Sequence, residues 1–339
     1  MPEETEPRQP PSPTGARVLR LTDFEQASSL YSSWQGRFEQ LTRGRFEGAL
    51  RVVRGGVIRV AAIAGNQSVR IRGRDSVGLI SVWPVIAGNA GCVWNGRRLT
   101  PGQLVLPGTD AEVDHRSARR AEALGVSLLP EALAEAARVV LNSDVTPFTH
   151  TWAVLAPHPK AYANLTRELT RLLTAGVADP SLLRTPEGHE LEQECVRSLV
   201  AALFPPSVPR SDLSLPGRSR LIRRAEEFMR ARLGDPLGAI DLCRELGASD
   251  RTLRLAFNER YGLGPIVYFK CLRLNAVRSK LKENPLITIA DAARQFGFHH
   301  LGNFAADYCR LFGERPSETL KSVSRGYFYP PGARPDEVQ

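Results

Sequence analysis

The sequence lacks the cysteine and histidine patterns that build metal centres and disulfide frameworks. Its five cysteines are scattered over 339 residues without a C-x-x-C pair, and no H-x-H occurs anywhere. Structural zinc sites need ligands at short spacings, and disulfide scaffolds need paired cysteines in a short secreted chain. We therefore predict neither a metal site nor a disulfide, and interpret the thiols as ordinary buried residues in a reducing cytoplasm.

Long apolar runs are also missing. No stretch approaches the roughly 18 consecutive apolar residues that a bilayer-spanning helix needs. Residues 1–15 are polar and rich in proline, and they have no apolar segment of the signal-peptide type. These absences predict a disordered N-terminal tail, no membrane partner and a cytoplasmic protein.

The motifs of several large enzyme classes do not occur. There is no G-x-S-x-G, no Walker loop and no G-x-G-x-x-G, since residues 262–267 (GLGPIV) lack the third glycine. His115 is the only histidine between residues 45 and 130, whereas a cupin-type metal site needs clustered His and carboxylate ligands. We predict that the protein is not an enzyme and has no cofactor. A cupin-type metalloenzyme fused to a DNA-binding module remains an alternative.

Positive charge is present in excess and is unevenly distributed. The formal net charge is +9, and residues 218–325 alone hold 20 Lys and Arg against 12 Asp and Glu. The remainder of the chain is therefore close to neutral. A basic module beside a neutral one indicates a polyanionic partner for the former. Charge alone leaves a membrane surface, RNA and DNA open.

The pattern along the chain predicts an α+β protein of two domains. Residues 16–41 carry apolar positions at helical spacing, and short alternating runs between about 45 and 130 predict an antiparallel β barrel or sandwich. Residues 130–204 read as flanking helices, the last with an apolar stripe suited to packing or dimerisation. The helical positions are Leu30, Tyr31, Trp34, Phe38 and Leu41, and the stripe is Leu191, Cys195, Leu199 and Leu203.

A proline-rich segment separates this half from the rest of the chain. Residues 205–217 contain four prolines and read as a linker, which an all-α module over 218–324 and a tail over 325–339 follow. We expect residues 16–204 to sense a small-molecule effector and to support a possible homodimer. Trp83, Trp94, Phe46 and His115 could line its pocket, although large aromatic residues at β spacing more often form core.

The helical module contains two candidate helix-turn-helix units. In the first, Gly247 supplies the turn and Ser249 caps the following helix. We expect an inner face of Ile240, Cys243 and Leu246 on the first helix, and of Leu253 and Phe257 on the second. The candidate DNA contacts of this unit are Ser249, Arg251, Thr252, Arg254 and Leu255.

In the second unit, Thr288 and Asp291 form a start like a capping box, and Gly297 supplies the turn. Its expected inner faces are Ile289, Ala292 and Phe296, followed by Phe304, Tyr308 and Phe312. The candidate DNA contacts are His299, His300, Leu301 and Asn303. An exposed turn pair is an equal alternative for the two histidines.

One long helix between Pro265 and Asn284 is expected to join the units. About 19 residues at 1.5 Å each extend ~28 Å, which can hold two recognition helices about one B-DNA turn (~34 Å) apart. The narrow major groove of RNA would exclude such helices, so the geometry favours DNA. We interpret Arg273, Arg278 and Lys280 as solvated or ion-paired on this helix rather than phosphate-bound.

These motifs resemble the DNA-binding domain of the AraC/XylS family. Over residues 218–322 the chain carries S-x-x-T-L-x-x-x-F, G-x-x-P, R-L-x-x-x-R and A-x-x-F-G-F. The segments RLNAVR, GFHHLGNFAADY and PSETL are similar in particular to regulators of the ethanolamine-utilisation operon. The resemblance implies a seven-helix DNA-binding domain that recruits RNA polymerase, preceded by an effector-sensing β domain.

The resemblance also implies that Arg251, Thr252, Arg254 and Leu255 lie on the first base-reading helix, where an arginine fork suits guanine. The second unit departs from the family pattern, because Leu301-Gly302 and Ala305-Ala306-Asp307 stand where polar or basic residues are common. We expect that unit to make phosphate, thymine-methyl or shape contacts. The sequence thus predicts a bacterial, effector-responsive activator that binds double-stranded DNA. The alternative is a non-specific DNA-binding or interaction protein.

Overall fold

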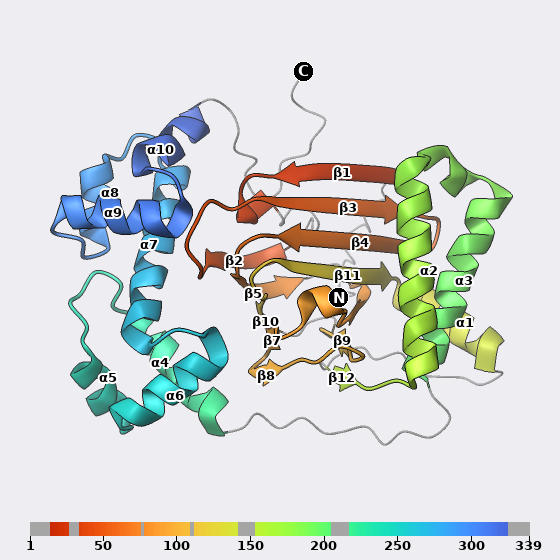
Figure 1. Ribbon diagram of the computed structural model, residues 1–339, viewed down its shortest axis with the longest axis horizontal. Coiled ribbons are helices and arrows are strands. Elements are labelled where there is room, and N and C mark those ends of the chain that lie inside the picture. Colours follow the sequence, from red (N-terminus) through yellow and green to blue (C-terminus); the bar gives the residue numbers. More distant parts are fainter. Residues whose placement is uncertain are drawn as a thin grey trace, which may run out of the picture.

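The computed structural model describes residues 14–26, 34–75, 78–108, 112–141, 153–204 and 217–324. Two β-sheets lie in the middle of the molecule (Figure 1). Helices α2 (Pro159–Ala178) and α3 (Pro186–Leu203) lie at one end of the strands, and the C-terminal helices lie at the other.

Both sheets are antiparallel, with seven strands in the order β1-β3-β4-β11-β6-β9-β12 and five in the order β2-β5-β10-β7-β8. The first sheet consists of β1 (Gly15–Leu21), β3 (Gly48–Arg54), β4 (Ile58–Gly65), β6 (Ile80–Pro84), β9 (Leu104–Leu106), β11 (Ala121–Leu128) and β12 (Ala153–Leu155). The second consists of β2 (Trp34–Gln40), β5 (Val69–Asp75), β7 (Val93–Trp94), β8 (Arg97–Arg98) and β10 (Val113–Arg116). The predicted antiparallel β architecture is confirmed, as a sandwich-like pair of open sheets rather than a closed barrel.

The predicted helices after residue 130 are also present. Helix α1 (Pro130–Leu141) precedes α2 and α3, and η2 (Ala87–Asn89) and η3 (Pro180–Arg184) are short 3-10 helices. The stripe of α3 is buried in one core cluster with α2 and the seven-stranded sheet, through Leu191, Cys195, Leu199 and Leu203. Of the two uses expected for this stripe, the structure shows packing within the chain.

The helix predicted over residues 16–41 is wrong. Residues 15–21 form β1, which pairs with β3, and residues 34–40 form β2, which pairs with β5. Val18 and Leu19 on β1 are both exposed, so this edge strand is held by its backbone pairing more than by burial. Phe38 and Leu41 are buried as the prediction required, but as parts of two different clusters. Leu30 and Tyr31 lie outside the described residues.

Residues 217–324 form seven helices, as the family resemblance implied. They are α4 (Gly217–Arg230), α5 (Ala239–Leu246), α6 (Asp250–Tyr261), α7 (Pro265–Glu283), α8 (Ile289–Gln295), α9 (Leu301–Phe312) and α10 (Pro316–Ser324). The linker prolines and the predicted tails lie outside the described residues, apart from residues 14 and 15, the second of which begins β1.

The sheets and the C-terminal helices share an apolar core. One cluster joins Phe24, Phe46 and Leu50 of the β half to buried residues of the second helix-turn-helix unit such as Phe304 and Tyr308. A second cluster places Leu41 among the residues of the first unit. The boundary that the sequence suggests at residues 205–217 therefore does not separate two independent cores.

Candidate nucleic-acid interface

The first helix-turn-helix unit consists of α5, a turn at Gly247 and α6. Gly247 has φ of 60°, a left-handed conformation that glycine adopts without steric cost. The Ser249 side chain caps α6 by accepting a hydrogen bond from the Thr252 backbone N–H at 3.2 Å. The turn and the cap are therefore built as the sequence predicts.

The expected inner face of α5 needs one correction. Leu242 and Leu246 are buried and Cys243 packs partly against them, whereas Ile240 is 73% exposed. Asp241 occupies the third helical position and accepts from the Gly238 backbone N–H at 2.8 Å, which fixes the register of this short helix. At about 100° per residue, Ile240 then points away from Leu242. On α6, Leu253 and Phe257 are buried as predicted.

The candidate DNA contacts of the first unit are exposed together on one side of α6. Ser249, Arg251, Thr252, Arg254 and Leu255 are all exposed. Arg254 Nε donates to the Asp250 carboxylate at 2.7 Å, one helical turn away. This pair holds the guanidinium over the helix surface. Because the pair is exposed, breaking it to free the Arg254 side chain costs well under ~1 kcal/mol.

The second unit consists of α8, a turn at Gly297 and α9. The Thr288 hydroxyl accepts from the Asp291 backbone N–H at 3.1 Å, so the predicted cap of α8 is confirmed. Gly297 has φ of 75°, and a Cβ there would lie 2.6 Å from the Gly234 carbonyl oxygen, so the turn requires glycine. The inner-face residues Ala292, Phe304, Tyr308 and Phe312 are buried, while Ile289 and Phe296 pack partly buried against them.

Helices α6 and α9 correspond position by position. Each has 12 residues and each ends at a left-handed glycine, Gly262 or Gly313. Matching their first residues places the exposed Gly302, Ala305 and Ala306 where α6 has Arg251, Arg254 and Leu255. The second unit therefore presents a surface almost without long side chains. His299, His300, Leu301 and Asn303 are exposed at its start.

Helix α7 joins the two units and is buried on most of its circumference. It begins at Pro265 and is capped at Asn284, as predicted, and its 19 residues correspond to ~28 Å. Arg278 is buried and ion-paired, which confirms the non-phosphate interpretation for that residue. Arg273 donates to the Phe296 carbonyl and lies over the Phe298 ring, with 4.5 Å from its Cζ to the ring centroid.

Comparisons with known proteins agree on this part of the chain. The family described as "Helix-turn-helix domain" matches residues 242–322. The chain is 32% identical over 112 residues to a probable thc operon regulatory protein of Rhodococcus erythropolis, which is 32% of this chain and 33% of that relative. It is 40% identical over 75 residues to XylDLEGF operon transcriptional activator 2 of Pseudomonas putida, 21% of this chain and 47% of that relative.

Residues 242–322 therefore form a helix-turn-helix domain, and the C-terminal part of the chain is similar in sequence to parts of these two operon regulators. Among solved structures, a probable AraC family transcriptional regulator from Rhodopseudomonas palustris CGA009 is 35% identical over 31% of this chain and 97% of its own, with a TM-score of 0.28. The matched segments span about a third to a half of the length of the two curated relatives. Both relatives are named as regulators rather than as enzymes.

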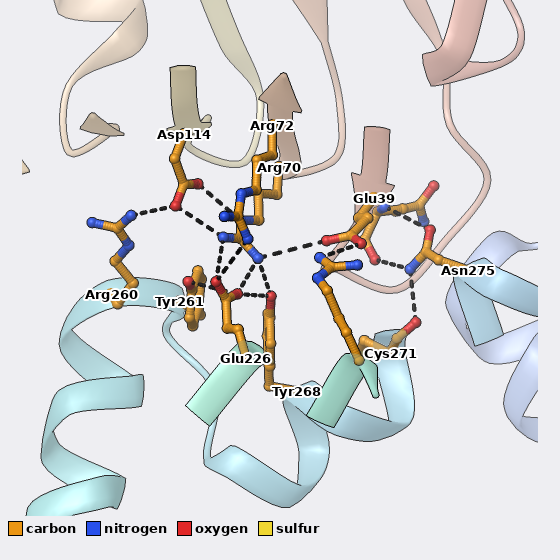
Figure 2. A network of polar contacts seen from close by, with 12 residues as sticks. Glu39, Arg70, Arg72, Asp114, Glu226, Arg260, Tyr261, Tyr268, Cys271 and Asn275 are labelled. Carbon is orange, nitrogen blue, oxygen red and sulfur yellow. Dashed lines mark hydrogen bonds and ion pairs between the residues drawn. The ribbon is translucent and has the colours of Figure 1, made fainter. Parts of the chain in front are cut away.

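A buried polar network joins the first unit of the helix-turn-helix domain to the five-stranded sheet (Figure 2). Arg70 of β5 has a fully buried side chain and pairs with Asp114 of β10 at 2.9 Å. Its other nitrogens contact the Glu226 carboxylate of α4, at 2.7 Å for the longer of two bonds, and the Tyr268 hydroxyl of α7. We call Arg70, Asp114, Glu226 and their direct partners the junction.

The junction carboxylates stay ionised because arginines surround them. Burial alone would raise the pKa of Asp114, but the guanidiniums of Arg70 and Arg260 outweigh it and hold the pKa below the usual value of 3.8. Burial also raises the pKa of Glu226, but the charge of Arg70 outweighs it, so the pKa of Glu226 falls below its usual value as well. At neutral pH the junction is therefore a charged contact between the domains.

Three more contacts belong to this interface. Arg230 of α4 pairs with Glu39 of β2 at 2.7 Å, and Arg260 at the end of α6 pairs with Asp114. Asn275 of α7 accepts from the Gln40 backbone N–H at 3.0 Å and donates to the Gln40 carbonyl at 3.1 Å. Sequence reasoning missed all of them. The available signal was V-R-I-R-G-R-D over 69–75, which puts three arginines on one face of a strand.

The second unit is held by a different set of contacts. Arg278 of α7 pairs with Asp23 at 2.9 Å and with Glu314 at 3.2 Å, and Lys282 also contacts Asp23. The Gly44 backbone N–H donates to the Arg310 carbonyl at 3.2 Å, at the end of α9. At Gly313, a Cβ would lie 2.7 Å from the Arg45 Cα, so the backbones of these two segments are in direct contact.

The four residues expected to line an effector pocket do not gather in one place. Trp94 and His115 lie together, with ring centroids 5.2 Å apart, and Trp83 packs against the same cluster. Phe46 lies elsewhere, with its ring edge against Phe24 and the shared core. Burial lowers the pKa of His115 to about 4, so this imidazole is neutral at pH 7. Trp94 and Phe46 are both buried, in agreement with the alternative that these aromatic residues form core.

In the described part of the chain, no three His, Cys, Asp or Glu side chains are grouped so as to hold a metal ion. No helix among the described residues combines the length and apolarity that crossing a membrane requires.

Proposed function

We propose that this protein is a DNA-binding transcription regulator that reads two successive major grooves on one face of a duplex. The observation that carries the proposal is the exposure of both second helices, α6 and α9, at the two ends of the buried helix α7. A rigid connection of ~28 Å suits two grooves one turn apart. The names of the curated relatives support the same role.

Within this proposal, the first unit supplies most of the base readout. Arg251 and Arg254 are exposed on α6, and an arginine fork can donate two hydrogen bonds to guanine. Ser249 and Thr252 at the start of that helix would make phosphate or base contacts. On α9, His299, His300 and Asn303 supply the polar groups, and Leu301 an apolar contact.

The β half is proposed to respond to a small-molecule effector and to pass that response to the DNA-binding domain through the junction. Differential binding of the effector to two arrangements of the domains would shift the DNA-binding state. We further propose a cytoplasmic activator that contacts RNA polymerase and acts as a homodimer. The resemblance to ethanolamine-utilisation regulators gives the first pathway to examine.

A selection of random duplexes against the purified full chain at about 150 mM salt tests the DNA-binding proposal. Two enriched blocks about 10 base pairs apart are expected, with the stronger information in the block read by α6. Salt-sensitive binding without any enriched sequence would instead favour a non-specific DNA-binding protein. No binding with or without candidate effectors would contradict the proposal.

A further inference from the structure

The outer face of the five-stranded sheet carries a row of charged residues that meets the DNA-binding domain. Strand pairing sets Glu39 opposite Arg70, Arg70 opposite Arg116, Arg116 opposite Val93, and Val93 opposite Arg98. Directly paired residues share one face of a sheet, so the row runs from the acidic edge at β2 to a basic edge at β8.

The two ends of this row differ in their partners. Arg70 is fully satisfied by Asp114, Glu226 and Tyr268, as Figure 2 shows. Arg116 and Arg98 have no acidic partner among the described residues. Arg116 Nε is buried without a hydrogen-bond partner, and so is Arg260 Nη1 on a side chain that is only 10% exposed.

The groups around Arg116 increase its need for an anion. A Cβ at Gly262 would lie 3.7 Å from Arg116 Nη1, so this guanidinium reaches the C-terminal end of α6. Asp114 lies two positions before Arg116 on the same face of β10, and its carboxylate already pairs with both Arg70 and Arg260. Burial lowers the pKa of Arg116, and the charges of Arg98 and Arg260 lower it further. The partial negative charge at the end of α6 offsets only part of this.

We propose that Arg98, Arg116 and Arg260 bind the oxyanion of a small molecule, a carboxylate or a phosphate, at the contact between β10 and the end of α6. Unpaired buried guanidinium donors are costly, and planar oxyanions satisfy them through paired hydrogen bonds. Arg98 is exposed and Arg116 is partly exposed, so the site opens to solvent on the β8 side.

This site gives the effector response proposed above a chemical class and a place. An anion held by Arg116 of the sheet and Arg260 of α6 bridges the β half to the end of the first reading helix. Binding of the anion strengthens the contact between the sheet and α6. By thermodynamic linkage, formation of that contact in turn strengthens binding of the anion.

The test is the melting temperature of the full chain in inorganic phosphate or acetate, each titrated against chloride at constant ionic strength. At ten times the dissociation constant, the better anion is expected to raise the melting temperature by about 2 °C or more. The anion with the larger shift identifies the head group. Two variants, Arg116→Met and Arg98→Met, are expected to lose most of the shift, and Arg98→Met removes an exposed residue with little risk to folding.

Arg37→Met is the matched control, because Arg37 is an exposed arginine on β2, the opposite edge strand of the same sheet. This variant loses one positive charge, as the site variants do, but should keep any rise in melting temperature that comes from a general salt effect of phosphate. A shift that survives in both site variants, or that Arg37→Met abolishes equally, would overturn the site.

Affinity for duplex DNA, measured separately by fluorescence anisotropy, tests the regulator proposal. Loss of DNA binding in Arg98→Met in parallel with loss of the phosphate shift would assign these arginines to the DNA backbone instead.

Discussion

The two helix-turn-helix units have the same backbone plan but opposite surfaces. Helices α6 and α9 have equal length and equivalent C-terminal glycines, yet α6 exposes Arg251 and Arg254 where α9 exposes Gly302 and Ala305. Their attachments to the β half differ as well. The first unit is held by the ion pairs of the junction, and the second by a shared apolar core together with Arg278.

This difference separates reading from anchoring. In the function proposed above, the long charged side chains on α6 would select bases, while the surface of α9, which has few long side chains, would let the backbone approach DNA closely and follow its shape. A change of charge can rearrange the ion pairs of both units, but the second unit also shares the larger apolar cluster with the β half, and that packing does not depend on charge. We therefore expect a charged signal to act on the first unit.

The largest expected effect comes from breaking the junction with Arg70→Met. This leaves Glu226 and part of Asp114 without their main counter-charge in a buried site, and such losses cost ~3–5 kcal/mol. Urea unfolding at pH 7 measures the free energy of unfolding. An effect below about 1 kcal/mol would contradict the importance given to this contact.

The pH dependence sharpens the same prediction. Asp114 and Glu226 have lowered pKa values in the folded protein, so their stabilisation is complete above the unfolded values of about 4 and is lost as the pH falls below them. Without Arg70 these folded-state pKa values rise. The difference in stability between the wild type and Arg70→Met should therefore shrink between pH 7 and pH 4.

A pair of glycine substitutions compares the anchoring of the two units. Gly262→Ala and Gly313→Ala both force alanine into a left-handed conformation, with φ of 67° and 68°, at a cost of ~1–2 kcal/mol. At Gly313 the new Cβ also meets the Arg45 backbone, which should add ~1–3 kcal/mol. Equal melting temperatures for the two variants would rule out the close backbone contact.

The reading surface of α6 is tested by Arg254→Ala. Loss of a bidentate base contact is expected to reduce affinity for the selected site by ~1–3 kcal/mol and to relax preference at one base position. Random DNA should be bound nearly as well as before. An equal loss on selected and random duplexes would assign Arg254 to phosphate contacts.

The smallest effect is expected for the equivalent position of the second unit. Ala305→Ser adds one hydroxyl to an exposed helix position and should change the affinity by less than ~0.5 kcal/mol. Anisotropy titrations of both variants on the same duplex make the comparison. A larger loss than that of Arg254→Ala would reverse the division between reading and anchoring.

Local sequence signals predicted the helix-turn-helix domain well. Gly247 and Gly297 mark turns that need left-handed glycine, Ser249 and Thr288 cap helices, and Phe304, Tyr308 and Phe312 repeat at the helical period. Each of these properties depends on neighbours within a few positions. The reading surface of α6 was therefore visible in the sequence, although its contacts with DNA stay a prediction.

Other features depend on partners far along the chain and were not predicted. Residues 34–40 form a strand because β5 pairs with them, and Ile240 is exposed because the cap at Gly238 sets the helix register. The pairing of Arg70 with Glu226 spans 156 positions. A single sequence shows the charges but not which of them meet.

The shared core also sets the order in which the chain can finish folding. Phe24, which follows β1, and Phe312, the last residue of α9, belong to one cluster, so the β half lacks part of its interior until the C-terminal helices have left the ribosome. During synthesis, those apolar residues need temporary cover. A chain truncated before α8 should therefore aggregate rather than accumulate as a free β domain.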